Sequence, residues 1–471
     1  MSASVRTFWL PGVMLLLFAA AISFRPLLPI DETRYMSVAW EMALRHDWLH
    51  PLTMNFEPYH QKPPLLFWLI NASWSIFGIS RWAGLVPVVL ASGSTVLLTA
   101  ALGRLLMPSV LHDRNRTALV MVSSVPFLAY STLVLFDLTV TVFVLSALIC
   151  LVKFSRGGSL LWMVAAGFCI GLGVLTKGPV AYLYTLFPMV LGPLWRESAM
   201  RPGRWFGGVG LALLVSALPV LMWLVPTLRQ ADGNFAFWLV WGQTAGRISG
   251  SFGDSHARPF YFYLPLLPVV AVPWLFFRSF WKGMADVEKE PWSEGTRFLL
   301  WWLVPTFFCF CLISGKQPHY LVPLLPGAVL FMALCLRKVS TADMAQTLAV
   351  MVGILVVGQA IASPTFFKSY DLRPVAEIMR ANPEADWAYV RNYHAEVGFL
   401  GSARKPLADV PMGNLAAWFA AHPQGFAIVS YRNEQGITRY QKLIDMPYRD
   451  RRLRVVRLKR DEPIVVGDGS S

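Results

Sequence analysis

The chain has 471 residues, of which 55% are hydrophobic and only 14% are charged, against about 25% charged residues in a typical soluble protein. This composition excludes a soluble globular protein, and it excludes an intrinsically disordered chain because disorder requires low hydrophobicity. The formal charge of +14 therefore raises the question of how basic residues divide between the two sides of a membrane. The five cysteines all lie in apolar runs, which indicates neither a disulfide framework nor a zinc cluster.

Apolar runs dominate the first three quarters of the chain, and a helix needs about 20 apolar residues to cross a bilayer. Eleven runs predict membrane-spanning helices, at residues 8–24, 82–103, 117–135, 138–152, 159–175, 179–195, 206–227, 260–280, 298–313, 319–336 and 345–364. A further run, residues 63–77, rises only about 22 Å as a helix and contains polar residues, so it predicts an interfacial helix. The predicted fold class is an all-α polytopic membrane protein.

Basic residues predict the orientation, because cytoplasmic loops of membrane proteins are enriched in Lys and Arg. With a cytoplasmic N-terminus, every inner loop is basic. These loops hold Arg104, Arg114, Arg116, Lys153, Arg156, Arg196, Arg201, Arg204, Lys282, Lys289, Arg297, Arg337 and Lys338. The outer side then receives a long first loop, residues 25–81, and a tail from about residue 365. A cleaved signal peptide is the alternative for the first run, but no small-x-small cleavage site follows it.

The tail, residues 365–471, has a composition typical of soluble proteins and predicts a small α/β domain after a transmembrane domain of residues 1–364. Short strands are predicted at Trp387–Val390 and Phe426–Ser430, and a helix at Leu415–Ala421. The segment Arg449–Arg460 alternates arginines with apolar residues. This pattern fits either a solvent-exposed edge strand or a strip attracted to anionic lipid headgroups.

Two acidic residues, Asp31 and Glu32, begin a segment whose apolar positions follow helical spacing from Tyr35 onward. One interpretation is structural: Asp31 caps the helix, and Glu32 is a first-turn acid favoured by the helix dipole. The other interpretation is catalytic, because a carboxylate held at a helix start near the membrane surface can accept a proton from an attacking hydroxyl group. The sequence leaves both interpretations open.

Three lysines lie at the ends of predicted membrane segments. Lys62 directly precedes a proline-initiated interfacial helix, Lys177 lies where one span ends and the next begins, and Lys316 occupies a related turn. Each also has a structural interpretation, since lysine snorkels to the headgroup level and is favoured at helix C-termini. Asp137 lies in a short turn between two predicted spans, where turn formation or capping would also account for it.

The predicted outer loop 228–259 contains Arg247, His256 and Arg258, and a run of aromatic residues follows it. Aromatic residues at a span start are typical of an interfacial belt. The two arginines fit a further role, because planar guanidinium groups suit phosphate oxygens. His256 shares this predicted face with His60 and His319, which makes a metal site conceivable, but none of the three has the spacing of a metal-binding motif.

The predicted spans hold almost no ionisable residues, whereas the polar residues above gather on one predicted face. Transporters and flippases usually place charges along a central pathway, so this distribution favours an enzyme. Cations at headgroup depth can hold a lipid-linked phosphate as the leaving group, while a carboxylate serves the acceptor. The pattern predicts group transfer on a lipid substrate, with a lipid-linked sugar flippase as the alternative.

Short motifs occur in order along the first 330 residues. They are Asp31-Glu32-Thr33-Arg34-Tyr35, Lys62-Pro63-Pro64-Leu65-Leu66, Leu175-Thr176-Lys177-Gly178-Pro179, His256 ahead of Arg258 to Pro265, and Lys316 to Tyr320 ahead of Pro323. These motifs resemble those of the bacterial lipid A aminoarabinose transferases, which are polytopic GT-C glycosyltransferases related to the protein O-mannosyltransferases. The resemblance implies a sugar donor on undecaprenyl phosphate and transfer at the periplasmic face of the bacterial inner membrane. Lipid A, another envelope glycan or a protein would be the acceptor.

The resemblance also implies roles for individual residues. Asp31 would be the catalytic base or the group that orients the acceptor, with Glu32 beside it and Asp137 as a second acidic position. Contacts to the donor phosphate would come from Lys62, Lys177, Arg258 and Tyr320, with Arg247 and Lys316 as further cations. The substrate cleft would include Tyr35, Tyr59, His60, Gln61 and His256.

One position departs from the family pattern. The family usually has an acidic residue directly before the lysine of the Lys-Pro-Pro motif, and this chain has Gln61 there. Because that acid can help a loop histidine to bind a metal ion, Gln61 argues against a metal site in this chain. No other cofactor is predicted.

Overall fold

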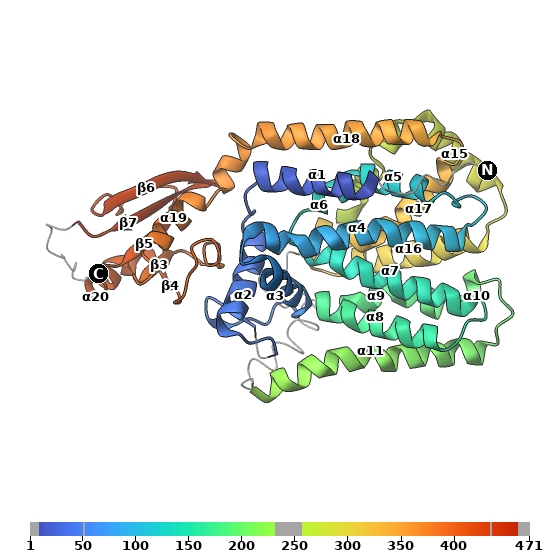
Figure 1. Cartoon of the computed structure of the whole chain (residues 1–471), viewed down its shortest axis with the longest axis horizontal. Coiled ribbons are helices and arrows are strands. Elements are labelled where there is room, and N and C mark those ends of the chain that lie inside the picture. Colours follow the sequence, from blue (N-terminus) through green and yellow to red (C-terminus); the bar gives the residue numbers. More distant parts are fainter. Residues whose placement is uncertain (1–8, 50–51, 231–256, 434–435, 460–471) are drawn as a thin grey trace. The chain divides into compact units, whose positions relative to one another are not determined.

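The computed structural model describes residues 9–49, 52–230, 257–433 and 436–459 (Figure 1). Contacts within the chain divide it into two compact units, which are described separately below. The helical unit comprises Met1–Ala19, Leu49–Pro51 and His60–Val357. The mixed unit comprises Ala20–Trp48, Leu52–Tyr59 and Gly358–Ser471.

The helical unit consists of α-helices with short 3₁₀ segments between them. Its first half contains α3 (Leu65–Phe77), α4 (Arg81–Leu106), α5 (Arg114–Ser123), α6 (Val125–Tyr130), α7 (Phe136–Ser155), α8 (Leu161–Lys177), α9 (Val180–Val190), α10 (Gly192–Trp195) and α11 (Pro202–Gln230). Its second half contains η2 (Phe260–Leu266), α14 (Leu267–Ala271), η3 (Trp274–Phe276), α15 (Arg278–Lys289), α16 (Glu294–Leu312), η4 (Pro318–Leu324) and α17 (Leu325–Cys335). Two helices, α1 (Trp9–Phe24) and α18 (Thr341–Ala362), contribute residues to both units.

The structure confirms the predicted multi-span membrane class. Six described helical segments are long and apolar enough to cross a membrane, namely α4, α7, α11, α16, η4 with α17, and α18. Shorter apolar helices are α1, α3, α8, α9 and η2 with α14. Each of the eleven predicted runs contains helix, and residues 63–77 form the short helix α3 as expected. The placement of α3 in an interface and the orientation of the loops stay predictions.

Four predicted spans are not single helices, and two of them, residues 179–195 and 319–336, divide into α9 with α10 and η4 with α17. Over residues 117–135 the chain breaks at Ser124, which has an extended backbone, and α6 starts with Pro126 in its first turn. Proline lacks the N–H that would continue the hydrogen-bond ladder of α5. Over residues 260–280 the chain forms η2, α14 and η3 because prolines recur there at short intervals. The helices over these two runs are therefore interrupted, a feature that the apolar runs alone do not predict.

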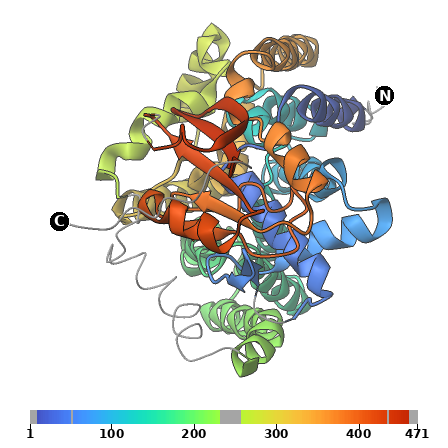
Figure 2. The ribbon, with the colours of Figure 1, turned by 90° about the vertical axis from the view of Figure 1, so that its left-hand side faces the viewer.

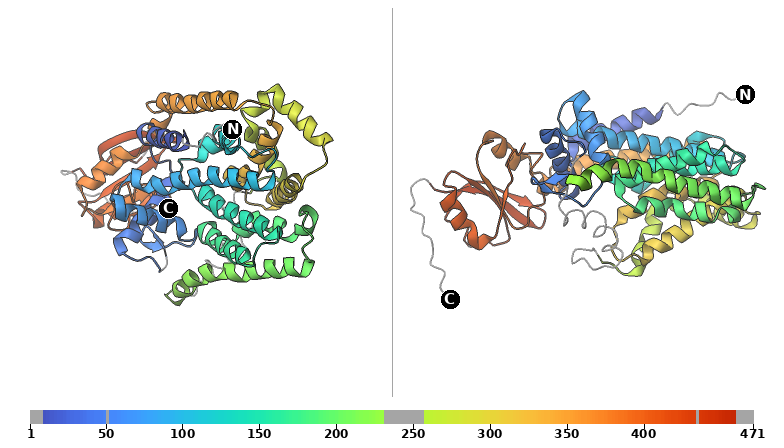
Figure 3. Two further views of the ribbon diagram at one scale, coloured as in Figure 1. Left: turned by 45° about the vertical axis from the view of Figure 1, so that its right-hand side comes forward. Right: turned by 90° about the horizontal axis from the view of Figure 1, so that it is seen from below.

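Small residues bring α8 and α11 close together. A Cβ atom at Gly167 would collide with the backbone of Ala212, and one at Gly171 would collide with the backbone of Ser216. Close backbone approach through small residues is a common way for membrane helices to pack, because it maximises van der Waals contact. The helices α4, α7, α8 and α11 thus lie side by side, each packed on the next (Figures 1 and 3).

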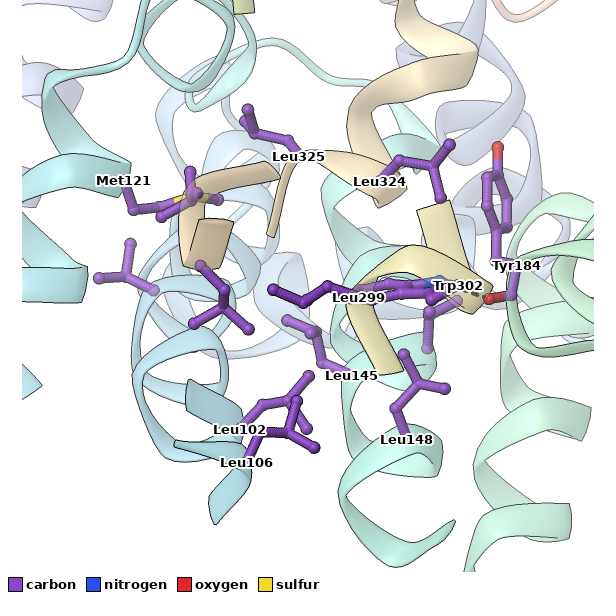
Figure 4. Close-up of a cluster of buried hydrophobic side chains, with 14 of the residues drawn as sticks. Leu102, Leu106, Met121, Leu145, Leu148, Tyr184, Leu299, Trp302, Leu324 and Leu325 are labelled. Carbon is purple, nitrogen blue, oxygen red and sulfur yellow. Dashed lines mark hydrogen bonds between the residues drawn. The ribbon is translucent and has the colours of Figure 1, made fainter. Parts of the chain in front are cut away.

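Larger apolar side chains fill the interior of the helical unit. Figure 4 shows leucines of α4 and α7 facing Leu299 and Trp302 of α16. The indole N–H of Trp302 donates to the backbone carbonyl of Tyr184 at 2.9 Å, which satisfies its polar atom inside this apolar layer. The packing joins the first half of the helical unit to its second half.

The mixed unit contains a five-stranded sheet with strand order β4-β3-β5-β7-β6 (Figure 2). The strands are β3 (Trp387–Val390), β4 (Ala408–Val410), β5 (Phe426–Tyr431), β6 (Gln441–Tyr448) and β7 (Arg451–Arg457). β3 is parallel to β4 and β5, whereas β7 is antiparallel to β5 and β6. Helix α19 (Arg373–Ala381) packs in the apolar cluster on one face, and α20 (Leu415–Ala421) packs in the cluster on the other. This arrangement confirms the predicted small α/β fold of the tail.

The predicted edge strand near the chain end is an interior strand. β7 lies between β5 and β6, so its backbone is paired on both sides. Leu453 and Val455 are buried in the apolar core, and Arg454 is also buried because its guanidinium pairs with Asp445 of β6. Arg454 therefore forms an internal salt bridge, which the edge-strand interpretation did not anticipate, whereas the Arg452 side chain is 51% exposed.

The first-loop helix α2 (Asp31–Arg45) belongs to the mixed unit. The Ser37 hydroxyl donates to the Ala395 carbonyl at 2.8 Å and accepts from the Phe399 N–H at 2.9 Å. The Trp40 indole N–H donates to the Ala403 carbonyl at 2.8 Å. These bonds fasten α2 to the α/β sheet domain.

A small hairpin, β1 (Thr53–Met54) with β2 (Glu57–Pro58), adds a second attachment of the first loop to the α/β domain. The Asn55 side chain donates to the Leu407 carbonyl at 2.9 Å and accepts from the Leu407 N–H at 2.8 Å. The part of the first loop that ends at Tyr59 thereby belongs to the same compact unit as the described part of the tail.

Candidate active site

The candidate residues of the helical unit centre on a buried ion pair. Asp137 lies in the first turn of α7, and Lys177 is the last residue of α8, followed by Gly178 with a positive φ of 86°. The Lys177 ammonium pairs with the Asp137 carboxylate, and the two side chains are only 6% and 3% exposed. Each charge also has the sign that its helix end favours.

The pairing corrects one interpretation of Asp137. It is neither a turn former nor a cap, because Leu135 occupies the N-cap position of α7 and Asp137 lies within the helix. Its carboxylate instead meets a lysine 40 residues further along the chain. The interpretation of Lys177 as a helix C-terminal residue followed by Gly178 is confirmed.

Tyr320 covers the lysine of this pair. The Lys177 Nζ lies 4.8 Å from the centroid of the Tyr320 ring, a cation–π distance. The Tyr320 carbonyl accepts a hydrogen bond from the Tyr184 hydroxyl at 2.8 Å, which fixes the segment η4 against α9. His319 packs edge-on against the Tyr320 ring, with the ring centroids 4.9 Å apart.

Lys62, which precedes α3, also lies near the start of α7. Its Nζ lies 5.8 Å from the centroid of the Phe136 ring, and Phe136 directly precedes Asp137. Phe136 is buried and packs edge-on against Phe67 of α3, with centroids 5.6 Å apart. The sequence interpretation missed Phe136, although its position next to Asp137 was visible. We call Lys62, Asp137, Lys177 and Tyr320 the helix-end cluster.

Lys316 has a different environment from the other two lysines. It is buried, and its ammonium donates to the carbonyls of Arg258 at 2.9 Å and Ile313 at 2.5 Å. The Arg258 N–H also donates to the Ser314 carbonyl at 3.3 Å. Burial lowers the pKa of Lys316. Lys316 thus joins the backbone of two segments, and this geometry favours a role in positioning the segment that carries Arg258.

Arg258 itself is exposed, and its guanidinium lies 5.8 Å from the centroid of the Phe262 ring. No acidic side chain forms an ion pair with it among the residues that the structure describes. The predicted contacts Arg247 and His256 fall in residues 231–256, outside the described residues. Of the cations predicted in this region, the structure therefore describes Arg258 and Lys316.

Asp31 and its neighbours belong to the mixed unit. Asp31 is the first residue of α2, and its side chain is 48% exposed. The carboxylate accepts from the Arg34 guanidinium at 2.5 Å and from the Tyr35 hydroxyl at 3.2 Å. The predicted N-cap role is wrong, because Ile30 occupies the cap position and Asp31 lies inside the helix. Its carboxylate is instead held along the first turn of α2.

In the sequence Arg34 stands out only as a member of the Asp31–Tyr35 motif, whereas in the structure its guanidinium orients Asp31. Burial acts to lower the pKa of Arg34, but the neighbouring Tyr59, Tyr35 and Asp31 outweigh burial and raise it. The guanidinium therefore stays charged beside the carboxylate. The signal in the sequence was the spacing of three residues between an acid and an arginine on one helix.

Glu32 is buried and pairs with the Arg25 guanidinium. Its carboxylate also accepts the Leu28 N–H at 2.9 Å. Both contacts hold the chain where it enters α2, which favours a structural role for Glu32. Its position in the first turn of α2 agrees with the predicted dipole-favoured acid.

The remaining cleft candidates divide between the two units. Tyr35 and Tyr59 are buried in the mixed unit, whereas His60 and Gln61 are half-buried in the helical unit next to Lys62. In the described part of the chain, no three His, Cys, Asp or Glu side chains are grouped so that they could hold a metal ion.

A comparison of sequences finds a related family over part of the chain. Residues 61–223 match the dolichyl-phosphate-mannose-protein mannosyltransferase family, and this segment contains Lys62, Asp137 and Lys177. The undecaprenyl phosphate-alpha-4-amino-4-deoxy-L-arabinose arabinosyl transferase 1 of Pseudomonas fluorescens is 30% identical over 312 residues, which is 64% of this chain and 54% of that protein. The corresponding transferase of Pseudomonas aeruginosa UCBPP-PA14 is 31% identical over 316 residues, again 64% and 54%. The chain spans little more than half the length of these relatives.

A comparison of structures extends over nearly the whole chain. The crystal structure of ArnT from Cupriavidus metallidurans bound to undecaprenyl phosphate superposes with a TM-score of 0.79 at 16% identity, covering 97% of this chain and 98% of that one. The chain has the ArnT-like GT-C fold. The archaeal oligosaccharyltransferase AglB from Archaeoglobus fulgidus is more distant in structure, with a TM-score of 0.53 at 13% identity over 91% of this chain and 70% of that one. The resemblance of this ArnT-like chain to the aminoarabinose transferases is thereby confirmed.

Proposed function

We propose that the protein is a membrane glycosyltransferase that moves a sugar from undecaprenyl phosphate to lipid A. The observation that carries the proposal is the helix-end cluster, in which Lys177 pairs with Asp137, Tyr320 flanks Lys177, and Lys62 lies over the ring of Phe136 at the start of α7. The donor is supported by the names of the sequence relatives and by the undecaprenyl phosphate bound to the related ArnT fold. Lipid A as the acceptor rests on the resemblance of the sequence motifs to the lipid A aminoarabinose transferases, and another envelope glycan or a protein is the alternative acceptor.

The charge of the helix-end cluster suits a departing phosphate. Lys62 and Lys177 against one carboxylate, Asp137, give the helix-end cluster a net charge of +1, and Arg258, the further proposed phosphate contact, brings the proposed set of charges to +2. A polyprenyl-linked sugar phosphate is a diester with one negative charge, whereas the released monoester carries about −1.5 to −2 near pH 7. The cations therefore match the product charge better than the donor charge. Interactions that strengthen as the bond breaks are those that accelerate the reaction.

Asp137 has a positioning role in this proposal. It holds the Lys177 ammonium at the start of α7 through one contact, while Tyr320 flanks the ammonium at cation–π distance. An ammonium has three N–H groups, so it can keep Asp137 and still donate to a phosphate oxygen. A preorganised donor of this kind needs little rearrangement when negative charge develops.

Asp31 is the proposed acceptor-side group. As the bond between the anomeric carbon and the phosphate oxygen breaks, its electron pair stays on the phosphate. The new bond forms between the same carbon and an acceptor oxygen, and the proton of that oxygen passes to the Asp31 carboxylate. A half-exposed carboxylate oriented by Arg34 and Tyr35 is suited to this step.

We also propose the bacterial inner membrane as the location, with a cytoplasmic N-terminus and the active site and residues 365–471 on the periplasmic side. A flippase is less favoured, because the charged residues of α4, α7 and α18 lie near the helix ends. A translocation pathway would place charged or polar groups across the middle of the membrane.

The test uses purified protein in nanodiscs with undecaprenyl-phosphate-linked aminoarabinose and lipid A. We expect modified lipid A by mass spectrometry and an equal amount of released undecaprenyl phosphate. Lys62→Ala should lower turnover by about 10–1,000-fold, as loss of one preorganised donor does. Lys153→Ala is the matched control, because this lysine contacts Trp162 near the other end of α7 and should leave turnover unchanged. Movement of intact donor between leaflets without release of undecaprenyl phosphate would support the flippase instead.

A further inference from the structure

The mixed unit contains a cavity of about 760 Å³. None of the residues proposed above to act in the sugar transfer lines this cavity. It lies where the parallel strands β3, β4 and β5 end, with Arg391 after β3, Asp409 in β4 and Ser430 in β5 among its lining residues. The carboxyl ends of parallel strands are where open α/β sheets commonly bind ligands. The volume lies within the range of about 300–1,000 Å³ usual for small-molecule sites. We call this cavity the strand-end crevice.

Arginines give the strand-end crevice its chemical character. Arg391, Arg449 and Arg451 line it, and none of them forms an ion pair among the described residues. The lining also holds three acidic residues, Glu396, Asp409 and Asp450, of which Asp450 is already paired with Arg432 outside it. Three guanidinium groups that form no ion pair in the described part of the chain are suited to an anion with planar, bidentate acceptor geometry, such as a phosphate group.

Hydroxyl-binding groups lie beside these arginines. Asn392 and Asp409 line the same crevice, and the Asp409 carboxylate accepts the Tyr393 N–H at 3.4 Å, a long bond that leaves acceptor capacity. The Tyr448 side chain is 4% exposed, and its hydroxyl has no hydrogen-bond partner among the described residues. Burial raises the pKa of Tyr448, so the hydroxyl stays protonated and can donate. A buried hydroxyl without a partner indicates a ligand or water position.

The strand-end crevice is adjacent to the start of α2. Ile30, the residue before Asp31, lines the crevice together with Glu396. Glu396 is buried and accepts the His394 N–H at 2.8 Å, and Arg34, which orients Asp31, is also close enough to act on its charge. One arginine of α2 therefore links the wall of the crevice to the proposed acceptor-side carboxylate.

We propose that the strand-end crevice binds the phosphorylated sugar of the acceptor and holds it beside Asp31. The arginines would take the phosphate, while Asn392, Asp409 and Tyr448 would bind sugar hydroxyl groups. This assignment rests on the proposed function, in that it names the part of the protein that recognises the acceptor. It gives the α/β domain a role in substrate binding that is separate from the donor contacts of the helix-end cluster.

The kinetic test compares arginine variants of the full-length protein in nanodiscs. The double variant Arg391→Ala/Arg449→Ala should raise the KM for lipid A by about 10–100-fold, since charged hydrogen bonds are involved. The KM for the undecaprenyl-linked donor should stay within about twofold. Arg404→Ala is the matched control, because this exposed arginine of the same unit is not part of the crevice lining. An unchanged KM for lipid A in the folded double variant, or a change confined to the donor KM, would overturn the proposal.

A binding test separates this proposal from the proposed function. The probes are a water-soluble bisphosphorylated glucosamine disaccharide, the same disaccharide without phosphate, and inorganic phosphate, each titrated against the full-length protein by calorimetry. We expect the phosphorylated disaccharide to bind most tightly and to lose at least about tenfold in affinity in the double variant. If the wild-type protein transfers no sugar at all, the proposed function fails, but this titration still decides the crevice. Equal binding of the phosphorylated disaccharide by wild type and double variant would refute it.

Discussion

The buried pair of Asp137 and Lys177 gives the sharpest quantitative prediction. Asp137→Asn removes the negative charge and keeps the side-chain shape, so the Lys177 ammonium stays in a site where its side chain is only 6% exposed. Removing one partner of a buried ion pair typically destabilises a protein by about 3–5 kcal/mol, because the other charge is left uncompensated. We expect a loss near the lower end, since the amide oxygen can still accept a hydrogen bond from Lys177.

The double variant Asp137→Asn/Lys177→Gln separates stability from catalysis. Two neutral amides can hydrogen-bond to each other, so most of the lost stability should return, giving a coupling free energy of at least about 2 kcal/mol in a double-mutant cycle. Turnover should remain low because the cation that receives the phosphate is gone. Unfolding in detergent, followed by circular dichroism, measures the free energies, and release of undecaprenyl phosphate measures turnover. A coupling below about 0.5 kcal/mol, or full activity of the double variant, would refute this reasoning.

Three further predictions concern the candidate site and the mixed unit. Asp31→Asn should lower turnover per purified molecule by about 10²–10⁴-fold with unchanged stability, and near-normal turnover would remove its role as a base. Arg258→Ala should lower turnover by about 10–1,000-fold, with Arg258→Lys restoring only part of it because a point charge cannot reproduce a planar contact; equal rescue would argue against phosphate binding. Burial raises the pKa of Asp445, but hydrogen bonds from Arg454 and two other side chains outweigh it and lower the pKa. Its stabilising contribution should therefore be lost as pH falls from about 4 through this lowered pKa, and Asp445→Asn should flatten that part of the acid-unfolding curve.

The predictable part of the fold is the part set by local composition. Long apolar runs have to become helices in a bilayer, because backbone N–H and C=O groups find no water there, and every predicted run is at least partly helical. Short buried strands such as Trp387–Val390 were equally clear from their apolar residues. The break at Ser124 was missed, although Pro126 was visible, because hydropathy alone does not register a missing N–H.

The sequence predicts which residues belong to the candidate site, but it does not predict which of them contact one another. Asp137 and Lys177 were named separately, but their contact depends on α7 and α8 packing antiparallel, which residue spacing does not reveal. The sequence does not distinguish Glu32 from Asp31 as a candidate catalytic acid, because nothing in it places Arg25 against the Glu32 carboxylate.

The interior position of β7 was equally hidden from the sequence. In the sequence Arg454 has the pattern of a solvent-facing residue. In the structure it is paired with Asp445 of the neighbouring strand β6. Contacts of this kind arise from tertiary packing, which residue spacing along the chain does not encode.

The most direct test of the central claim is mass spectrometry of the envelope lipids of the source bacterium with and without the gene. The account predicts that lipid A of the parent strain carries an added aminodeoxypentose, that the deletion strain lacks it, and that the wild-type gene restores it while Asp31→Asn does not. Identical lipid A in parent and deletion strains, under conditions in which the protein is present in the membrane, would contradict the proposed transfer to lipid A.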